Sequence, residues 1–194
     1  MDNELFFIVN PNSGNSKGRI WDEISTYMTE KGINFGCYLT KSANDAVNAI
    51  PQILSEGHRN LIVLGGDGTI LRAAELVTCT DVPILGINMG HVGFLAEYES
   101  FQIHEAIHRI AEHDYSIEER MIAHVDVWLL DAATPLGDWA LNDITIERAD
   151  RGKMVELSIA VDGVAMSSFG CDGIIVSTPT GSTAYAFSAG GPII

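Results

Sequence analysis

Asp67 is the residue of this chain whose neighbours most clearly indicate chemistry. It lies among three glycines directly after the apolar run 61–64, in the turn Gly65-Gly66-Asp67-Gly68-Thr69. Glycine has no side chain and tolerates positive φ, so such a turn lets backbone amides approach phosphate oxygens closely. An aspartate beside phosphates is repelled unless a proton or a metal ion lies between them. We therefore predict phosphoryl transfer, with Asp67 accepting a proton or holding magnesium.

A second polar segment follows the apolar run 173–176 and supplies many hydroxyl groups. We expect Ser182 or Thr183 to cap a short helix that ends at Gly190-Gly191, which would direct an amide-rich helix start toward a ligand. The hydroxyl-bearing residues of the segment are Thr178, Thr180, Ser182, Thr183, Tyr185 and Ser188.

The elements that position Asp67 alternate between strand and helix patterns over residues 1–119. Alternation of this kind predicts an α/β domain with a parallel sheet, helices on both faces, and ligands at the carboxyl ends of the strands. The expected strands are 5–9, 33–40, 60–64 and 83–87, and the expected helices lie near 18–31, 42–54, 71–77 and 101–113.

The pattern changes near residue 120, and residues 120–194 predict an all-β domain. The expected strands are 124–130, 140–147, 155–161 and 173–176, with turns at Gly137-Asp138, 150–152 and Asp162-Gly163. The chain stops at residues 190–194, where an apolar segment is beginning, so we expect this domain to be incomplete and the chain to be C-terminally truncated.

Composition excludes several classes of protein. The net charge of −15 argues against general binding to nucleic acid or to an anionic membrane, and no apolar run approaches the length of a membrane span. Three scattered cysteines form no CxxC pair, so we expect small buried thiols and a cytoplasmic location. His104 and His108 have a spacing that zinc uses, but their neighbours complete no ligand set, and we expect no protein-held metal site.

Four motifs together resemble the NAD kinase family. The glycine turn is the signature that NAD kinases share with diacylglycerol and sphingosine-type lipid kinases. Three later segments resemble NAD kinases in particular, and members of the actinobacterial type most of all. They are LGINMGHVGFL at 85–95, ALND at 140–143 and DGIIVSTPTGSTAYAFSAGGP at 172–192.

The resemblance implies a role for each matching residue. Asp67 resembles the catalytic aspartate that takes the proton of the adenosine-ribose 2′-hydroxyl of NAD as this hydroxyl attacks the γ-phosphate of ATP. Asn142 and Asp143 would hold the substrate ribose, although the family usually has glutamate where Asp143 stands. The other implied contacts are Gly65, Gly66, Gly68 and Thr69 with phosphates, Phe94 with adenine, Thr183, Ala184, Tyr185 and Ser188 with NAD, and Asp172 near the nicotinamide half, across a subunit interface.

The implied fold is NAD kinase/diacylglycerol kinase-like, and the implied activity is Mg²⁺-ATP-dependent phosphorylation of NAD to NADP. Residues 1–119 would bind the ATP phosphates and residues 120–194 would begin the NAD-binding domain. Mg²⁺ would enter with ATP, NAD would be the substrate, and the full-length protein would be a homo-oligomer, either a dimer or a tetramer.

The first sixty residues resemble the lipid-kinase branch instead, because FIVNPNSGNSKG at 7–18 is similar to the opening phosphate loop of bacterial lipid kinases. This leaves open a chimera joined at the glycine turn, or a natural relative whose N-terminus has diverged. The alternative functions are a diacylglycerol or sphingosine-type lipid kinase, and an inactive fragment or chimera that still binds nucleotide.

Overall fold

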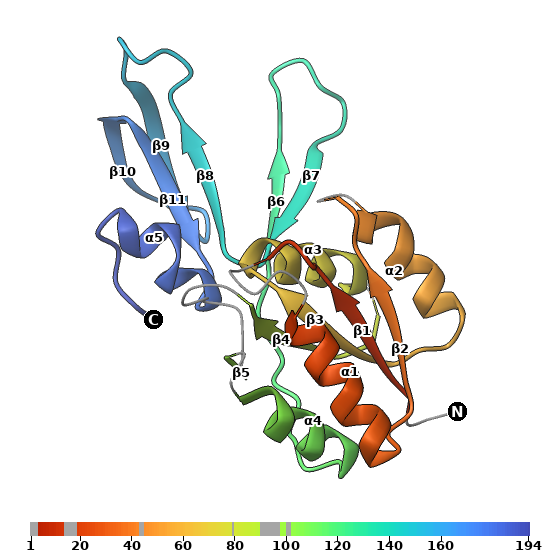
Figure 1. Cartoon of the computed structure of the whole chain (residues 1–194). Helices are drawn as coiled ribbons and strands as arrows, with labels where there is room; N and C mark the ends of the chain where they lie inside the picture. Colours follow the sequence, from red (N-terminus) through yellow and green to blue (C-terminus); the bar gives the residue numbers. More distant parts are fainter. Residues whose placement is uncertain (1–3, 14–18, 43–44, 79, 90–97, 100–101) are drawn as a thin grey trace. The chain divides into compact units, whose positions relative to one another are not determined.

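A computed structural model describes residues 4–13, 19–42, 45–78, 80–89, 98–99 and 102–194 (Figure 1). The chain divides into two compact units, Met1–Glu118 and Glu119–Ile194, which are described separately below. No helix in the described part of the chain is long and apolar enough to cross a membrane.

The first unit is built on a five-stranded, fully parallel sheet with the order β2-β1-β3-β4-β5. The strands are β1 (Leu5–Val9), β2 (Phe35–Leu39), β3 (Asn60–Gly65), β4 (Ile84–Asn88) and β5 (Tyr98–Glu99). The helices that connect or follow them are α1 (Arg19–Lys31), α2 (Asp45–Ser55), α3 (Asp67–Val77) and α4 (Ile103–Ala111).

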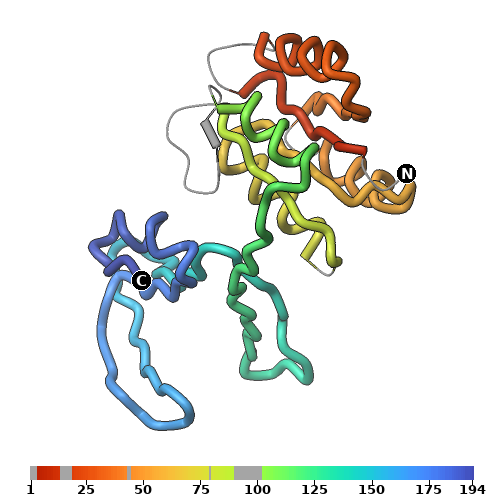
Figure 2. Tube along the Cα trace, turned by 90° about the horizontal axis from the view of Figure 1, so that it is seen from below, coloured from red at the N-terminus to blue at the C-terminus, as the bar shows by residue number. Residues whose placement is uncertain are grey.

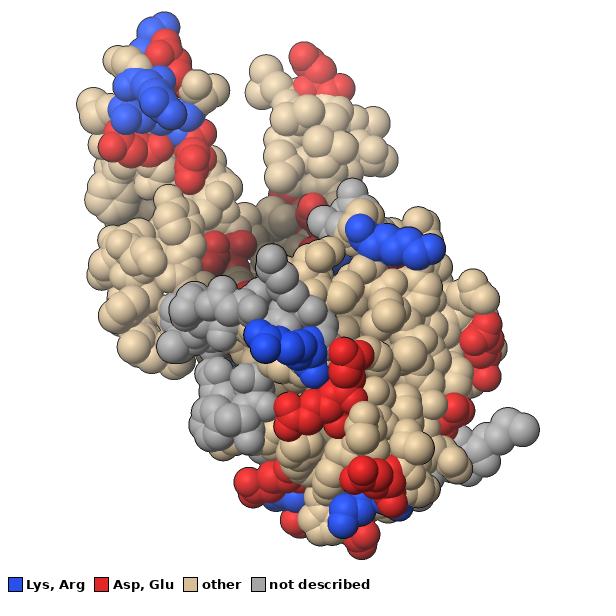
Figure 3. Space-filling view, in the orientation of Figure 1, with Lys and Arg blue, Asp and Glu red and all other residues tan. Residues whose placement is uncertain are grey.

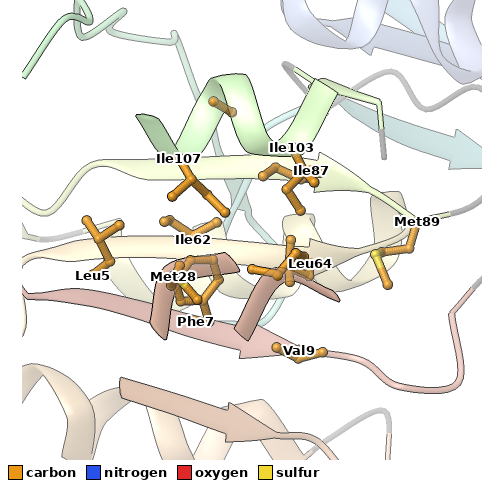
Figure 4. Packing of buried hydrophobic residues seen from close by; sticks show 12 residues of the cluster. Leu5, Phe7, Val9, Met28, Ile62, Leu64, Ile87, Met89, Ile103 and Ile107 are labelled. Atoms are coloured by element: carbon orange, nitrogen blue, oxygen red, sulfur yellow. The ribbon is translucent and has the colours of Figure 1, made fainter. Parts of the chain in front are cut away.

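The two faces of this sheet are covered by different helix pairs, because neighbouring residues of a strand point to opposite faces. Leu5, Phe7 and Val9 of β1 pack with Ile62 and Leu64 of β3 against α1 and α4, and Figure 4 shows these side chains directed into one layer. The intervening strand residues pack against α2 and α3 on the other face; they are Phe6, Ile8, Leu61 and Val63. Burial on both faces explains why β1 and β3 are continuous apolar runs.

The strand order places a topological switch point between β1 and β3. The chain leaves β1 toward β2 on one side, and it leaves β3 toward β4 on the other side. In open α/β sheets, ligands bind outside the carboxyl ends of the strands at such a point. Asn10 directly follows β1, and Gly66 directly follows β3, so both residues lie at this edge.

Helices α1, α2 and α4 end in a Schellman hydrogen-bond pattern, which requires one residue in the left-handed region. That residue is Gly32 (φ 68°) after α1 and Gly57 (φ 96°) after α2, but it is His113 (φ 56°) after α4. The backbone N–H of His113 donates to the carbonyl of Ile110 at 3.0 Å. Helix α4 therefore ends in a Schellman motif without the glycine that usually marks a helix end in a sequence.

The second unit consists of three two-stranded antiparallel sheets, which pair β6 with β7, β8 with β11 and β9 with β10. Figure 2 shows the β6–β7 and β9–β10 pairs as two long hairpins. The strands are β6 (Ala123–Val127), β7 (Leu136–Ala140), β8 (Asp143–Glu147), β9 (Val155–Val161), β10 (Val164–Cys171) and β11 (Gly173–Ser177), followed by η2 (Thr180–Thr183) and α5 (Tyr185–Ser188).

The fold class predicted from the sequence is confirmed, since a parallel α/β unit with helices on both faces is followed by a β-rich unit. The short strand β5 was not predicted, and three details of the second unit were wrong. The segment 140–147 is two strands rather than one, Gly137-Asp138 lies inside β7 rather than in a turn, and β10 was missed. Strand β10 lacks a regular alternation of apolar and polar residues, which was the signal used for the other strands.

Apolar side chains of the second unit remain exposed. Trp128 is 65% exposed and Phe169 is 51% exposed, and Leu130 is fully exposed. Among the described residues of this unit, Ala186 is the only buried hydrophobic side chain. The second unit therefore has strands and turns but no hydrophobic core of its own within the described residues.

The cysteines depart from the expectation of buried thiols. Cys37 is exposed on β2, and Cys171 is half-buried at the end of β10; both are free. Cys79 lies outside the described residues.

Candidate functional site

The glycine turn is the junction of β3 and α3 rather than a separate loop. Gly65 is the last residue of β3, and Asp67 is the first residue of α3. None of Gly65, Gly66 and Gly68 has a positive φ, which corrects the expectation from sequence, and Gly66 has φ −88°. Gly65 is required for another reason: a Cβ there would lie 2.6 Å from Cβ of Thr69. Because Gly65 has no side chain, Thr69 in the first turn of α3 can pack directly against the end of β3.

The loop that follows β1 lies beside this junction. Nδ2 of Asn10 donates to Oγ1 of Thr69 at 3.2 Å, and the backbone N–H of Asn10 donates to the carbonyl of Leu64 at 2.9 Å. A Cβ on Gly66 would lie 3.6 Å from Oγ of Ser13. Polar side chains from the loop after β1 and from the first turn of α3 therefore meet at the switch point.

Asp67 is partly exposed at the first position of α3. The first amides of a helix have no intrahelical acceptor, and the helix dipole adds positive potential there, so this end attracts anions. A carboxylate beside an anion site can accept a proton from a hydroxyl group that approaches the anion. The arrangement suits transfer of a phosphoryl group to an alcohol.

The end of β4 continues the same edge of the sheet. The backbone N–H of Met89 donates to the carbonyl of Gly65 at 3.0 Å, and Asn88 is buried. Phe94, which the sequence assigned to an adenine pocket, lies outside the described residues.

In the second unit, Asn142 links the start of β8 to the segment that follows β11. Its backbone carbonyl accepts from the N–H of Thr178 at 2.9 Å and from Oγ1 of the same residue at 3.1 Å. Its side-chain Oδ1 is buried and has no hydrogen-bond partner, a feature shared among the described residues only with Nε2 of His104. A buried acceptor without a donor costs about 1–3 kcal/mol, so a ligand that donates a hydroxyl proton would find favourable binding here.

Gly181 allows the segment 178–181 to lie close to the backbone of Asn142. A Cβ on Gly181 would lie 2.0 Å from the backbone oxygen of Asn142, a distance that no side chain tolerates. The N–H of Gly181 donates to Oγ1 of Thr178 at 3.1 Å, and Thr178 is buried. Residues 178–181 are therefore packed against the residue that precedes Asp143 and β8.

A cavity of about 600 Å³ lies in the second unit and includes two predicted site residues, Asp172 and Tyr185. Asp172 is bound twice to Arg148: Nη1 of Arg148 lies 2.8 Å from Oδ1, and the N–H of Arg148 donates to the carbonyl of Asp172 at 2.9 Å. The other lining residues are Glu147, Arg151, Gly173, Ile174 and Ile175. Figure 3 shows basic and acidic side chains gathered at the connection between β8 and β9, the segment to which Arg148 and Arg151 belong.

The remaining predicted residues, Thr183, Ala184 and Ser188, lie at η2 and α5. Neither Ser182 nor Thr183 caps a helix, which corrects the sequence expectation: Oγ of Ser182 donates to the carbonyl of Pro179 at 2.7 Å instead. The expected end at Gly190 is present, because Gly190 has φ 91° and completes the Schellman pattern of α5.

The structure thus groups the predicted residues by unit. Gly65 to Thr69 lie together in the first unit, while Asn142 and Asp143 lie beside 178–183 in the second. Sequence reasoning did not predict the contact of Asn10 with Thr69, or those of Thr178 and Gly181 with Asn142. Asn10 lies in the segment that resembles a phosphate loop, and Thr178 lies in the hydroxyl-rich segment, but neither pattern indicated which residue it would contact.

Both units match models of one protein family. Residues 5–115 match the ATP-NAD kinase N-terminal domain, and residues 141–194 match the ATP-NAD kinase C-terminal domain. The first match includes the segment whose opening loop resembles lipid kinases. Among curated proteins, an NAD kinase of Bifidobacterium longum subsp. infantis is 76% identical over 144 residues, which are 74% of this chain and 43% of that protein. An NAD kinase of Corynebacterium diphtheriae is 53% identical over 134 residues, 69% of this chain and 42% of that protein.

Two solved structures have a similar fold. The structure of yeast NADH kinase complexed with NADH matches with a TM-score of 0.79 at 22% identity. The match covers 100% of this chain and 63% of the yeast chain. An NAD kinase from Archaeoglobus fulgidus in complex with ATP has a TM-score of 0.69 at 27% identity, over 98% of this chain and 67% of that one. This chain spans about two fifths of the length of the curated relatives that it matches.

Proposed function

Because this chain belongs to the ATP-NAD kinase family, we propose that it takes part in the phosphorylation of NAD to NADP by Mg·ATP. The observation that supports this most directly is Asp67 at the first position of α3, at the switch point of a parallel sheet. That position combines an anion-binding helix start with a proton acceptor.

We assign the ATP phosphates to the first unit. Gly65, Gly66 and Gly68 leave space beside the first amides of α3, and Thr69 adds a hydroxyl. The Archaeoglobus fulgidus relative has been solved with ATP, which supports a nucleotide site in this fold. Phe94 would complete the adenine side of this site.

We assign the NAD ribose to Asn142 and Asp143, because the buried Oδ1 of Asn142 lacks the donor that a ribose hydroxyl would provide. Asp143 has a shorter side chain than the glutamate usual in the family, yet it still offers two acceptor oxygens. Asp172, with Thr183, Ala184, Tyr185 and Ser188, would bind the rest of the dinucleotide.

Mg²⁺ belongs to this proposal as part of the substrate Mg·ATP. The described residues contain no cluster of three or more His, Cys, Asp and Glu side chains suited to a metal ion. Mg²⁺ keeps waters and phosphate oxygens as ligands in most kinase sites, so it can enter with ATP without a dedicated cluster of protein ligands. The ion would offset phosphate charge while the protein aligns the two substrates.

In the proposed reaction, Asp67 accepts the proton of the adenosine-ribose 2′-hydroxyl while the hydroxyl oxygen bonds to the γ-phosphorus. The bond between that phosphorus and the bridging oxygen breaks, and ADP leaves. We further propose that the protein is cytoplasmic and forms a homo-oligomer.

The test is to incubate the chain with Mg·ATP and either NAD or diacylglycerol, and to measure NADP and phosphatidate by chromatography. We expect NADP and no phosphatidate. Phosphatidate would favour the lipid-kinase alternative. Measurable NAD binding with no product from either substrate would favour the alternative of an inactive nucleotide-binding fragment.

A further inference from the structure

We propose that Asn10 is a positioning residue of the phosphate site, because its side-chain amide fixes the hydroxyl of Thr69 as a hydrogen-bond donor. The inference rests on the proposed function, since it takes the ATP phosphates to lie against the start of α3. Asn10 lies 59 residues before Thr69 in the chain and outside the glycine motif.

Two contacts settle the orientation of the Asn10 amide. The backbone N–H of Asn12 lies 3.1 Å from one amide atom, and because an N–H only donates, that atom is the oxygen Oδ1. The other amide atom is therefore Nδ2, which only donates. It lies 3.2 Å from Oγ1 of Thr69, so Asn10 is the donor and Thr69 is the acceptor.

This polarity decides what Thr69 offers to a ligand. A hydroxyl group has one proton and two lone pairs, and a lone pair that accepts from Asn10 leaves the proton directed elsewhere. The oxygens of an ionised phosphate group only accept, and hydrogen bonds to charged acceptors are roughly twice as strong as neutral ones. Asn10 therefore leaves Thr69 with the group that phosphate needs.

Both partners of this bond are held in place. The side chain of Thr69 lies against Gly65, where a Cβ would come within 2.8 Å of Oγ1. The backbone of Asn10 is tied to β3 through Leu64. Because Asn10 is anchored at the end of β1 and Thr69 in the first turn of α3, the hydrogen bond is kept at little further cost in side-chain entropy.

Asn10→Asp is the sharpest test, since it reverses the polarity of the bond with little change in shape. An ionised carboxylate only accepts, so the Thr69 hydroxyl would donate to it and present lone pairs to the phosphates. We expect the Kd of Mg·ATP, measured by calorimetry, to rise at least about tenfold at about pH 8, where the carboxylate is ionised.

A double-mutant cycle separates this role from direct contact with the nucleotide. Thr69→Val keeps the shape that fits against Gly65 but removes the hydroxyl. We expect Asn10→Ala to raise the Kd about fivefold in the natural chain and to have almost no effect in the Thr69→Val background. An equal effect in both backgrounds would overturn the positioning role and assign Asn10 to the ligand itself.

Asn48→Asp is the matched control, because it makes the same change on an exposed position of α2. We expect it to leave the Kd unchanged, and a tenfold rise there would refute the polarity argument in favour of a general charge effect. Urea unfolding of each variant checks that the first unit remains folded. If the natural chain binds no Mg·ATP, the proposed function fails and this inference fails with it; if it binds and Asn10→Asp binds equally well, only this inference fails.

Discussion

Asp67 occupies a position where two electrostatic effects oppose each other. A carboxylate in the first turn of a helix is stabilised by the helix dipole by about 0.3–1 kcal/mol. The same dipole attracts phosphate, and the two anions repel each other at short range. A proton delivered by the attacking hydroxyl, or a magnesium ion on the phosphates, removes that conflict. In its proposed role, Asp67 is therefore favoured at the moment of transfer, when the proton or the magnesium ion offsets the repulsion between the two anions.

Replacing Asp67 by Asn should therefore separate chemistry from binding. We expect Asp67→Asn to lower kcat for NADP formation by about 10²–10⁴-fold, because the amide cannot accept the hydroxyl proton. Binding of Mg·ATP, measured by calorimetry, should stay the same or tighten, since one negative charge is lost. Near-normal NADP formation in this variant would remove Asp67 from the role of base.

Gly181 provides a second test, which concerns shape alone. We expect Gly181→Ala to destroy NAD binding, because the added methyl group would collide with the backbone of Asn142 and displace it. The measurement is NAD binding by saturation-transfer NMR. Gly170→Ala is the control, since its methyl group would meet only the flexible end of Met154 at 3.4 Å. Equal NAD binding by the two variants would contradict the close approach of residues 142 and 181.

At the scale of elements, the sequence predicted what depends on neighbours in the chain and missed what depends on distant ones. The strands β1 and β3 were found because burial on both sheet faces demands continuous apolar runs. The glycine turn was found too, but its glycines were explained by positive φ, whereas Gly65 is needed because Thr69 packs against it. The bond from Asn10 to Thr69 joins residues far apart in the chain, so no local pattern indicates it.

The end of α4 shows the same limit and yields a stability prediction. His113 occupies the left-handed position that Gly32 and Gly57 occupy after α1 and α2. The left-handed conformation costs a residue with a Cβ about 1–2 kcal/mol, whereas glycine loses about 0.5–1 kcal/mol through the extra chain entropy of its unfolded state. We expect His113→Gly to raise the free energy of unfolding of the first unit by about 0.5–1 kcal/mol.

Urea unfolding followed by tryptophan fluorescence measures this change, because Trp21 packs against the core of the first unit. Gly32→Ala is the opposite control and should lower the same free energy by about 1 kcal/mol. If His113→Gly proves no more stable than the natural chain, the left-handed residue at this helix end carries no strain.

At the scale of the whole molecule, the two units differ in what holds them together. The first has a sheet covered on both faces by buried side chains from four helices. The second has three two-stranded sheets, and a two-stranded sheet is marginal in water without a packed face. Asn142 and Asp143 belong to the second unit, so the proposed ribose contacts depend on the less firmly packed of the two.

Hydrogen exchange on the whole chain tests this difference. Amides of β1 and β3 should exchange only through global unfolding of the first unit, at least about a thousandfold more slowly than those of β9 and β10. The β6–β7 ribbon, with Trp128 and Leu130 exposed just after β6, should exchange as fast as β9–β10. Adding NAD should slow exchange at 142–143 and 178–183 first, because ligand binding to the folded form stabilises the segments it contacts. Equal protection of both units without ligand would mean that the second unit is held by contacts other than a core of its own.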